Sequence, residues 1–261
     1  MKALRRLGWF IGGVYIIACL GLYFLQDQII FRPQPLPETH HFRTGTEVEI
    51  PVEEGIALNA LWIREARSKG VILYLHGNRG SNRRCLRQTR GMQGHGYDIF
   101  MPDYRGYGKS DGSITSEAQM HADIQEVYDY LKQHYRETQI IVLGYSIGTG
   151  MATYLTAHND PQQLVLVAPY LSMVNLKNRW APVIPNFIVR YPLRSADWIS
   201  KIEQQITLFH GTEDNVIPYD SSEELQQLNP ERSQLITLQG ESHRGALFNP
   251  LFKRQLAELL P

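Results

Sequence analysis

The sequence predicts an α/β protein with a mostly parallel β-sheet, preceded by one N-terminal helix that could cross a membrane. Short apolar runs without polar alternation recur along the chain, which is typical of strands covered on both faces. Amphipathic helical stretches separate these runs, as in βαβ units. The N-terminal helix is predicted from residues 8–25, where 18 successive positions carry no charge. A bilayer core requires roughly 20 such residues.

We interpret residues 1–30 as a membrane anchor. Lys2, Arg5 and Arg6 precede the apolar stretch, and Trp9 and Tyr23 stand near its ends, where aromatic side chains meet the membrane surface. The positive charges predict a single-pass protein with a cytoplasmic N-terminus and the main domain on the extracytoplasmic side. Three alternatives are a cleaved signal peptide, lipidation at Cys19 and a buried core helix. Flanking charges count against the last of these.

The rest of the chain divides into a proline-rich linker at 31–44, expected to be stiff, and one domain at 45–261. Alternating residues at 47–50 and 56–62 predict a pair of antiparallel edge strands. Buried parallel strands are predicted at 71–75, 140–143, 164–167 and 206–209, with further candidates at 97–101 and 235–238.

Helices are predicted between these strands. Ser116 and Gln119 match a capping box, and apolar residues at helical spacing continue to Leu131. Further helices are expected at 151–157 and 247–260. Residues 169–204 hold too many prolines and aromatic residues for a simple crossover helix. We interpret this segment as a lid over the carboxyl edge of the sheet.

Composition narrows the possible partners. The 26 basic and 26 acidic residues balance, which argues against nucleic-acid binding. One local cluster is basic, and it is either a solvated helix face or a contact for anionic head groups or an anionic substrate. Its members are Arg79, Arg83, Arg84, Arg87 and Arg90. No disulfide, metal site or cofactor is predicted, since only two cysteines occur and no CxxC or HExxH pattern is present.

Residues 144–148, GYSIG, match the G-x-S-x-G pattern of a nucleophile elbow. An apolar strand precedes the pattern and a helix-forming run follows it, which is the setting that this turn requires. Ser146 is therefore the candidate nucleophile. The glycines at either side are expected because neighbouring backbone must approach closely at a strained turn.

A serine hydroxyl needs an adjacent base. The sequence HGTED directly follows the predicted strand at 206–209, and Asp214 is the preferred acid, with Glu213 and Asp220 as alternatives. His243 follows the last strand and precedes the terminal helix, so it is the candidate base. The backbone N–H groups of Asn78 and Ile147 are the expected oxyanion donors.

These motifs resemble those of the α/β-hydrolase superfamily, and within it the Bem46-like and ABHD13/ABHD17-like group of membrane-associated serine hydrolases. The matching pieces are HGN at 76–78, DYRGYGKS at 103–110, GYSIGTG at 144–150, HGTEDNVIP at 210–218 and ESH at 241–243. The resemblance implies an eight-stranded, mostly parallel sheet with helices on both faces, a lid after the sixth strand, and no cofactor. It gives the 103–110 turn a structural role.

The expected function is hydrolysis of an ester or thioester of a small or lipid-like acyl substrate by Ser146, His243 and Asp214. A serine peptidase or amidase is one alternative. A catalytically silent membrane scaffold on a hydrolase fold is another, because a fold alone does not establish activity.

Overall fold

The computed structural model describes residues 1–260 of the 261-residue chain. A central sheet of eight strands has the order β10-β9-β8-β7-β4-β6-β3-β2. The β2–β3 and β3–β6 pairs are antiparallel, and the other pairs of this sheet are parallel. The strands are β2 (Thr46–Glu53), β3 (Ile56–Ile63), β4 (Val71–Leu75), β6 (Asp98–Pro102), β7 (Ile140–Tyr145), β8 (Gln163–Val167), β9 (Gln205–Gly211) and β10 (Ser233–Leu238).

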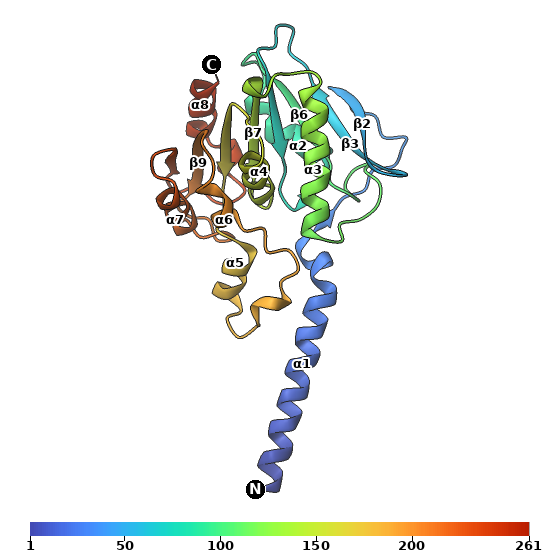
Figure 1. Ribbon diagram of the computed structural model, residues 1–261, viewed down its shortest axis with the longest axis vertical. Helices are drawn as coiled ribbons and strands as arrows, with labels where there is room; N and C mark the ends of the chain where they lie inside the picture. Colours follow the sequence, from blue (N-terminus) through green and yellow to red (C-terminus); the bar gives the residue numbers. More distant parts are fainter. Residues whose placement is uncertain (261) are drawn as a thin grey trace.

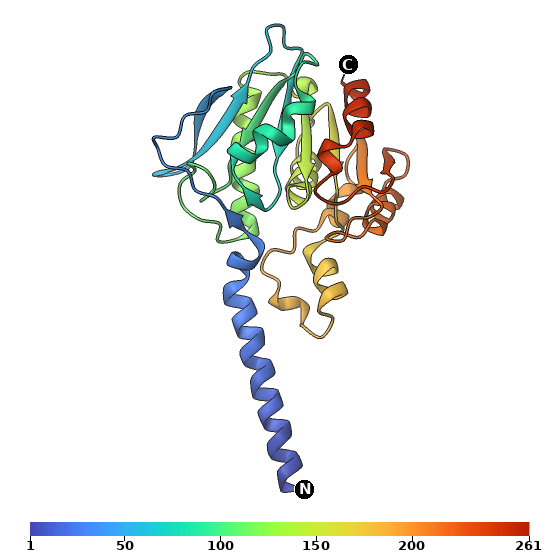
Figure 2. The same cartoon turned by 180° about the vertical axis from the view of Figure 1, so that it is seen from behind.

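Helices cover both faces of this sheet (Figures 1 and 2). One face carries α3 (Glu117–Lys132), α4 (Gly148–Ala157), α6 (Ser195–Ile199) and α7 (Asp220–Leu228). The other face carries α2 (Asn82–Gln88), the 3₁₀ turns η1 (Thr89–Met92) and η4 (Ala246–Phe248), and α8 (Pro250–Leu259). A further 3₁₀ turn, η2 (Glu137–Gln139), leads into β7.

The apolar runs of the sequence are explained by these two layers. In β4, Val71, Leu73 and Leu75 pack into the core beneath α3 and α4, while Ile72 and Tyr74 pack beneath α2 and α8. Every residue of β4 is buried, so no polar alternation is possible. The predicted fold class is confirmed.

Several element boundaries differ from the sequence predictions for identifiable reasons. The strand at 56–62 was expected at an edge, but β3 lies between β2 and β6. The C-terminal helix is interrupted at Asn249, whose side chain accepts the N–H groups of Leu251 and Phe252 and so caps α8. The hydroxyl of Ser116 caps α3 as expected, but the Gln119 side chain bonds the N–H of Thr115 instead of closing the capping box.

The N-terminal helix α1 (Lys2–Ile30) projects from the domain (Figure 1). The segment predicted to be a lid contains α5 (Met173–Trp180), and the loop after α5 contacts α1 through the Tyr15 and Gln26 side chains. Helix α1 is the one described helix that is long and apolar enough to cross a membrane. The proline-rich segment after α1 is hydrogen-bonded to the domain. Its strand β1 (Arg32–Pro33) pairs in parallel with β5 (Arg79–Gly80), and the N–H of Leu36 bonds the Gly108 carbonyl.

Candidate active site

Ser146 stands at a sharp turn between β7 and α4. Its φ of 54° lies in the left-handed region, which costs free energy for a non-glycine residue. The turn also requires two glycines. A Cβ at Gly144 would lie 2.7 Å from the Gly148 carbonyl oxygen, and a Cβ at Gly148 would lie 2.2 Å from the Leu75 carbonyl oxygen. The G-x-S-x-G spacing is thus set by close backbone contacts.

The structure brings Ser146, His243 and Asp214 together at the carboxyl edge of the sheet. His243 Nε2 lies 3.0 Å from Ser146 Oγ, and His243 Nδ1 lies 2.7 Å from Asp214 Oδ2. Because the carboxylate only accepts hydrogen bonds, Nδ1 carries the imidazole proton and Nε2 is left as the acceptor for the serine hydroxyl. This arrangement can move a proton from Ser146 to His243.

The carboxylate of Asp214 is held ionised by its hydrogen bonds. Its side chain is fully buried, and burial alone would raise its pKa. Hydrogen bonds from His210 and His243 outweigh burial and hold the pKa well below its usual range. The second oxygen, Oδ1, accepts the N–H groups of Val216 and Ile217 at 2.8 and 2.9 Å.

His210 also belongs to this site, although no pattern in the sequence assigned it a role. Its Nε2 lies 3.2 Å from Asp214 Oδ2 and 2.9 Å from the Ile217 carbonyl. Both are acceptors, so Nε2 carries the proton, and Nδ1 accepts the Ser222 hydroxyl at 2.6 Å. The available signal was a histidine four residues before the candidate acid.

The two alternative acids lie elsewhere. Glu213 is exposed. Asp220 forms an ion pair with Arg179, at 2.5 Å. Neither has a hydrogen bond or ion pair with His243, whose carboxylate partner is Asp214.

Two backbone N–H groups beside Ser146 are free to donate. Among residues 1–260, no acceptor lies on the amide of Asn78 or of Ile147. The Asn78 loop is fixed from three sides: its carbonyl accepts the Tyr107 hydroxyl at 2.8 Å and the Arg32 N–H at 2.9 Å, and its side chain donates to the Ile30 carbonyl. The turn at 103–110 therefore supports this loop.

Comparison with known proteins adds the family. The family model described as "Serine aminopeptidase, S33" matches residues 66–208, which is more than half of the chain. This chain belongs to that α/β-hydrolase family. The match includes Ser146 but ends before Asp214 and His243. The proximity of these two residues to Ser146 is therefore an observation from the structure and not from the family match.

Curated relatives of this hydrolase cover most of its length. The lysophosphatidylserine lipase ABHD12 of Danio rerio is 27% identical and spans 88% of this chain and 72% of its own. Protein bem46 of Schizosaccharomyces pombe is 29% identical over 78% and 75%, respectively. YfhR of Escherichia coli, an uncharacterized protein, is 24% identical over 95% and 89%.

Solved structures share the fold of this hydrolase. The esterase Pf2001 of Pyrococcus furiosus superposes with a TM-score of 0.71 at 19% identity and covers 88% of this chain and 98% of its own. Est1E of Butyrivibrio proteoclasticus superposes with a TM-score of 0.67 at 19% identity over 81% and 97%. At this identity the similarity shows the fold alone.

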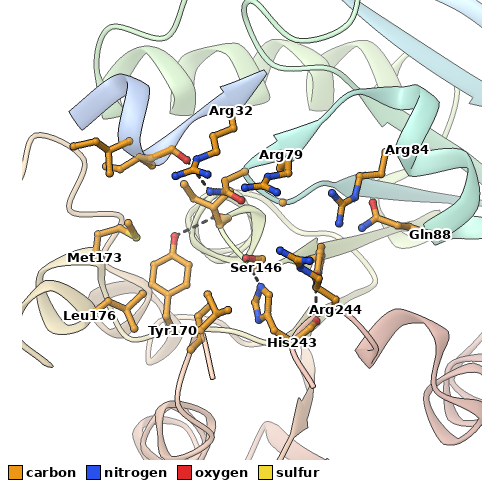
Figure 3. A pocket seen from close by; sticks show the side chains of 18 residues that line it. Arg32, Arg79, Arg84, Gln88, Ser146, Tyr170, Met173, Leu176, His243 and Arg244 are labelled. Atoms are coloured by element: carbon orange, nitrogen blue, oxygen red, sulfur yellow. Dashed lines mark hydrogen bonds between the residues drawn. The ribbon is translucent and has the colours of Figure 1, made fainter. Parts of the chain in front are cut away.

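A cavity of about 430 Å³ opens onto the serine and the histidine of this hydrolase (Figure 3). Met173 and Leu176 of the lid lie on one side of Ser146, and Arg84 and Arg244 lie on the other. Burial raises the pKa of Tyr145, beside the serine, to about 12, although the charges of Arg84 and Arg244 act against this rise. Within residues 1–260, no group of His, Cys, Asp or Glu side chains is placed to hold a metal ion.

Proposed function

We propose that this protein is a membrane-anchored serine hydrolase that cleaves ester or thioester bonds of a hydrophobic acyl substrate. The observation that carries the proposal is the continuous hydrogen-bond chain from Ser146 Oγ through His243 to Asp214, with distances of 3.0 and 2.7 Å. It ends in the cavity, where a substrate carbonyl can reach the serine.

In the proposed mechanism, Ser146 Oγ attacks the carbonyl carbon while His243 Nε2 takes its proton. Asp214 holds the imidazole tautomer and stabilises the imidazolium. The N–H groups of Asn78 and Ile147 donate to the oxyanion of the tetrahedral intermediate. His243 then returns the proton to the leaving group, and water hydrolyses the acyl-enzyme by the same steps.

The acyl side of the substrate is proposed from the apolar wall of the cavity. Ile29, Met173 and Leu176 line this wall, and they come from α1 and the lid helix α5. An alkyl chain would bury apolar surface there at about 25 cal/mol per Å². The relative named as a lysophosphatidylserine lipase supports an ester substrate of this kind.

Membrane attachment is proposed from α1. Most large apolar side chains that are exposed on the molecule lie on this helix, and such a surface is unfavourable in water. We propose that α1 spans the bilayer with Lys2, Arg5 and Arg6 in the cytoplasm and the domain on the opposite side.

The test is covalent labelling by a fluorophosphonate together with turnover of short p-nitrophenyl esters. We expect Ser146→Ala to abolish both, because the nucleophile is gone. Ser242→Ala, which removes an exposed hydroxyl beside His243, is the matched control and should keep both. Labelling and turnover that persist in Ser146→Ala would rule out the proposed nucleophile, and wild type that neither labels nor turns over would favour the silent scaffold.

A peptidase or amidase is the second candidate, because the family description names an aminopeptidase. Esters and amides with the same acyl group separate the two functions. We expect kcat/KM for the ester to exceed that for the amide by several orders of magnitude. A comparable value for a peptide amide would favour the peptidase.

A further inference from the structure

Four arginines from separate segments line the catalytic cavity. Arg32 belongs to β1, Arg79 to β5 and Arg84 to α2, while Arg244 follows the catalytic-site histidine. No aspartate or glutamate among the described residues lines this cavity. None of the four guanidinium groups forms an ion pair with a carboxylate within residues 1–260, whereas Arg105 is paired with two.

The backbone places the starting points of these arginines close together. Arg32 and Arg79 are register partners in the parallel β1–β5 pair, so two like charges start from adjacent positions, which is unfavourable without an anion between them. Gly80, with φ +108°, leaves room for Arg84. A Cβ there would lie 3.0 Å from Arg84 Cδ.

We propose that this arginine cluster (Arg32, Arg79, Arg84 and Arg244) is a subsite for an anionic group, a phosphate or carboxylate, on the leaving-group side of the acyl ester. The inference rests on the proposed hydrolase function. Guanidinium groups suit this role because their planar N–H pairs match the oxygens of phosphate and carboxylate.

The cavity has two chemically distinct ends. In Figure 3, Arg84 and Arg244 lie on one side of Ser146, and Met173 and Leu176 lie on the opposite side. A substrate with its acyl chain against the lid and its anionic group among the arginines would place its ester bond at Ser146. The leaving alcohol then carries the charge and departs toward the arginines.

The test compares two esters that differ in one group: a 1-monoacylglycerol and the matching 1-acylglycerol 3-phosphate. The full chain is assayed in neutral detergent with a soluble butanoyl pair and with a decanoyl pair. We expect kcat/KM to be about tenfold or more higher for the phosphate ester in both pairs, and to fall with added salt. The butanoyl comparison needs no variant, so it remains decisive whatever a variant does to folding.

Variants then locate the effect. The double substitution Arg79→Gln with Arg84→Gln should lower kcat/KM for the phosphate ester about tenfold or more, and much less for the neutral ester. Arg84→Lys keeps the positive charge but not the planar pair of N–H donors, so we expect an intermediate loss in kcat/KM for the phosphate ester. Arg83 lies on α2 with Arg84 but outside the cavity. Arg83→Gln should therefore leave kcat/KM unchanged for both esters.

Three results would overturn the subsite. The first is equal or lower kcat/KM for the phosphate ester in wild type. The second is an equal loss on both esters in a folded double variant. The third is a preference confined to the decanoyl pair, which would assign charge recognition to the lipid aggregate surface. If Ser146 is not required for turnover of either ester, the proposed function itself fails instead.

Discussion

Two imidazoles donate to one carboxylate oxygen of Asp214. His243 stands 2.7 Å from Oδ2 and faces Ser146, and His210 stands 3.2 Å from the same atom on the far side. His210 thus helps to orient the carboxylate that accepts the hydrogen bond from His243. Hydrogen-bond partners of this kind fix the direction of a catalytic group without touching the substrate.

We predict that His210→Leu lowers kcat by about tenfold or more, with a small change in KM, because Asp214 loses one donor and its fixed orientation. His210→Gln, whose amide N–H can still donate, should retain more of the activity. Steady-state kinetics on a short ester measure both values. A change in KM alone, with kcat intact, would contradict a positioning role.

The low pKa of Asp214 predicts how stability changes with acid. The folded-state pKa of Asp214 lies below the unfolded value of about 3.9. The ionised carboxylate therefore adds to the free energy of unfolding above about pH 3.9, and this contribution is lost as the pH falls through the folded-state pKa. Asp214→Asn removes this contribution. We expect the gap in Tm between wild type and Asp214→Asn to narrow below about pH 4.

Thermal melts in detergent from pH 7 to pH 3 measure this gap. Glu213→Gln, an exposed neighbour, is the control and should follow wild type at every pH. A Tm gap for Asp214→Asn that stays constant over the whole range would show that this carboxylate does not carry the effect.

At the scale of elements, α1 and the segment predicted to be a lid are joined by side-chain hydrogen bonds, one of them buried. The Gln26 side chain donates to the Ile188 carbonyl and accepts the Arg190 N–H, and both Arg190–Asp27 contacts lie within 3.0 Å. Ile188 and Arg190 lie in the lid, around the turn η3 (Asn186–Ile188). These contacts hold Ile188 and Arg190 against the end of α1.

We predict that Gln26→Ala loosens the contact between α1 and residues 188–190, because it leaves the buried Ile188 carbonyl and the partly buried Arg190 N–H without their partner, at a cost of about 1–3 kcal/mol. Hydrogen exchange at the Arg190 amide should accelerate at least tenfold, while β7 and β8 keep their protection. Gln28→Ala, exposed on the same helix, should exchange like wild type. Unchanged protection at Arg190 in Gln26→Ala would contradict this role of Gln26.

At the scale of the whole molecule, the apolar tip of the lid and the anchor helix extend in the same direction (Figures 1 and 2). The lid exposes Trp180, Val183 and Phe187 at 69–80%, and the hydroxyl of Tyr15 on α1 donates to the Val183 carbonyl at 2.6 Å. Both surfaces would meet the same bilayer.

We predict that Val14→Arg combined with Ile17→Arg releases the protein from membranes, because each charge at mid-bilayer costs about 2.5–3.5 kcal/mol on insertion scales. Extraction with alkaline carbonate, followed by quantification in pellet and supernatant, measures the release. Leu228→Arg, which places the same charge on an exposed site of the domain, should stay in the pellet. Wild type in the supernatant would contradict the anchor.

Some elements of this protein carried little local signal. Helix α2 reads NRRCLRQ, with charges where helical periodicity needs apolar residues, and it is held by the burial of Cys85 against the sheet. The β1–β5 pair is two residues long, too short for any pattern of alternation. Its partners lie 47 positions apart along the chain (Arg32 and Arg79).

The sequence by itself determined most of the strands and the elbow at Ser146, because buried parallel strands need unbroken apolar runs and the elbow needs glycines at fixed spacing. It also predicted Asp214 and His243 from their places after two strands, with Glu213 and Asp220 left as alternative acids. Only the tertiary structure decided that His210 supports Asp214, that Gln26 joins the anchor to the lid, and that four arginines meet in one cavity. These relations depend on how closely separate segments approach one another in the folded protein. Residue spacing along the chain does not encode the distances between those segments.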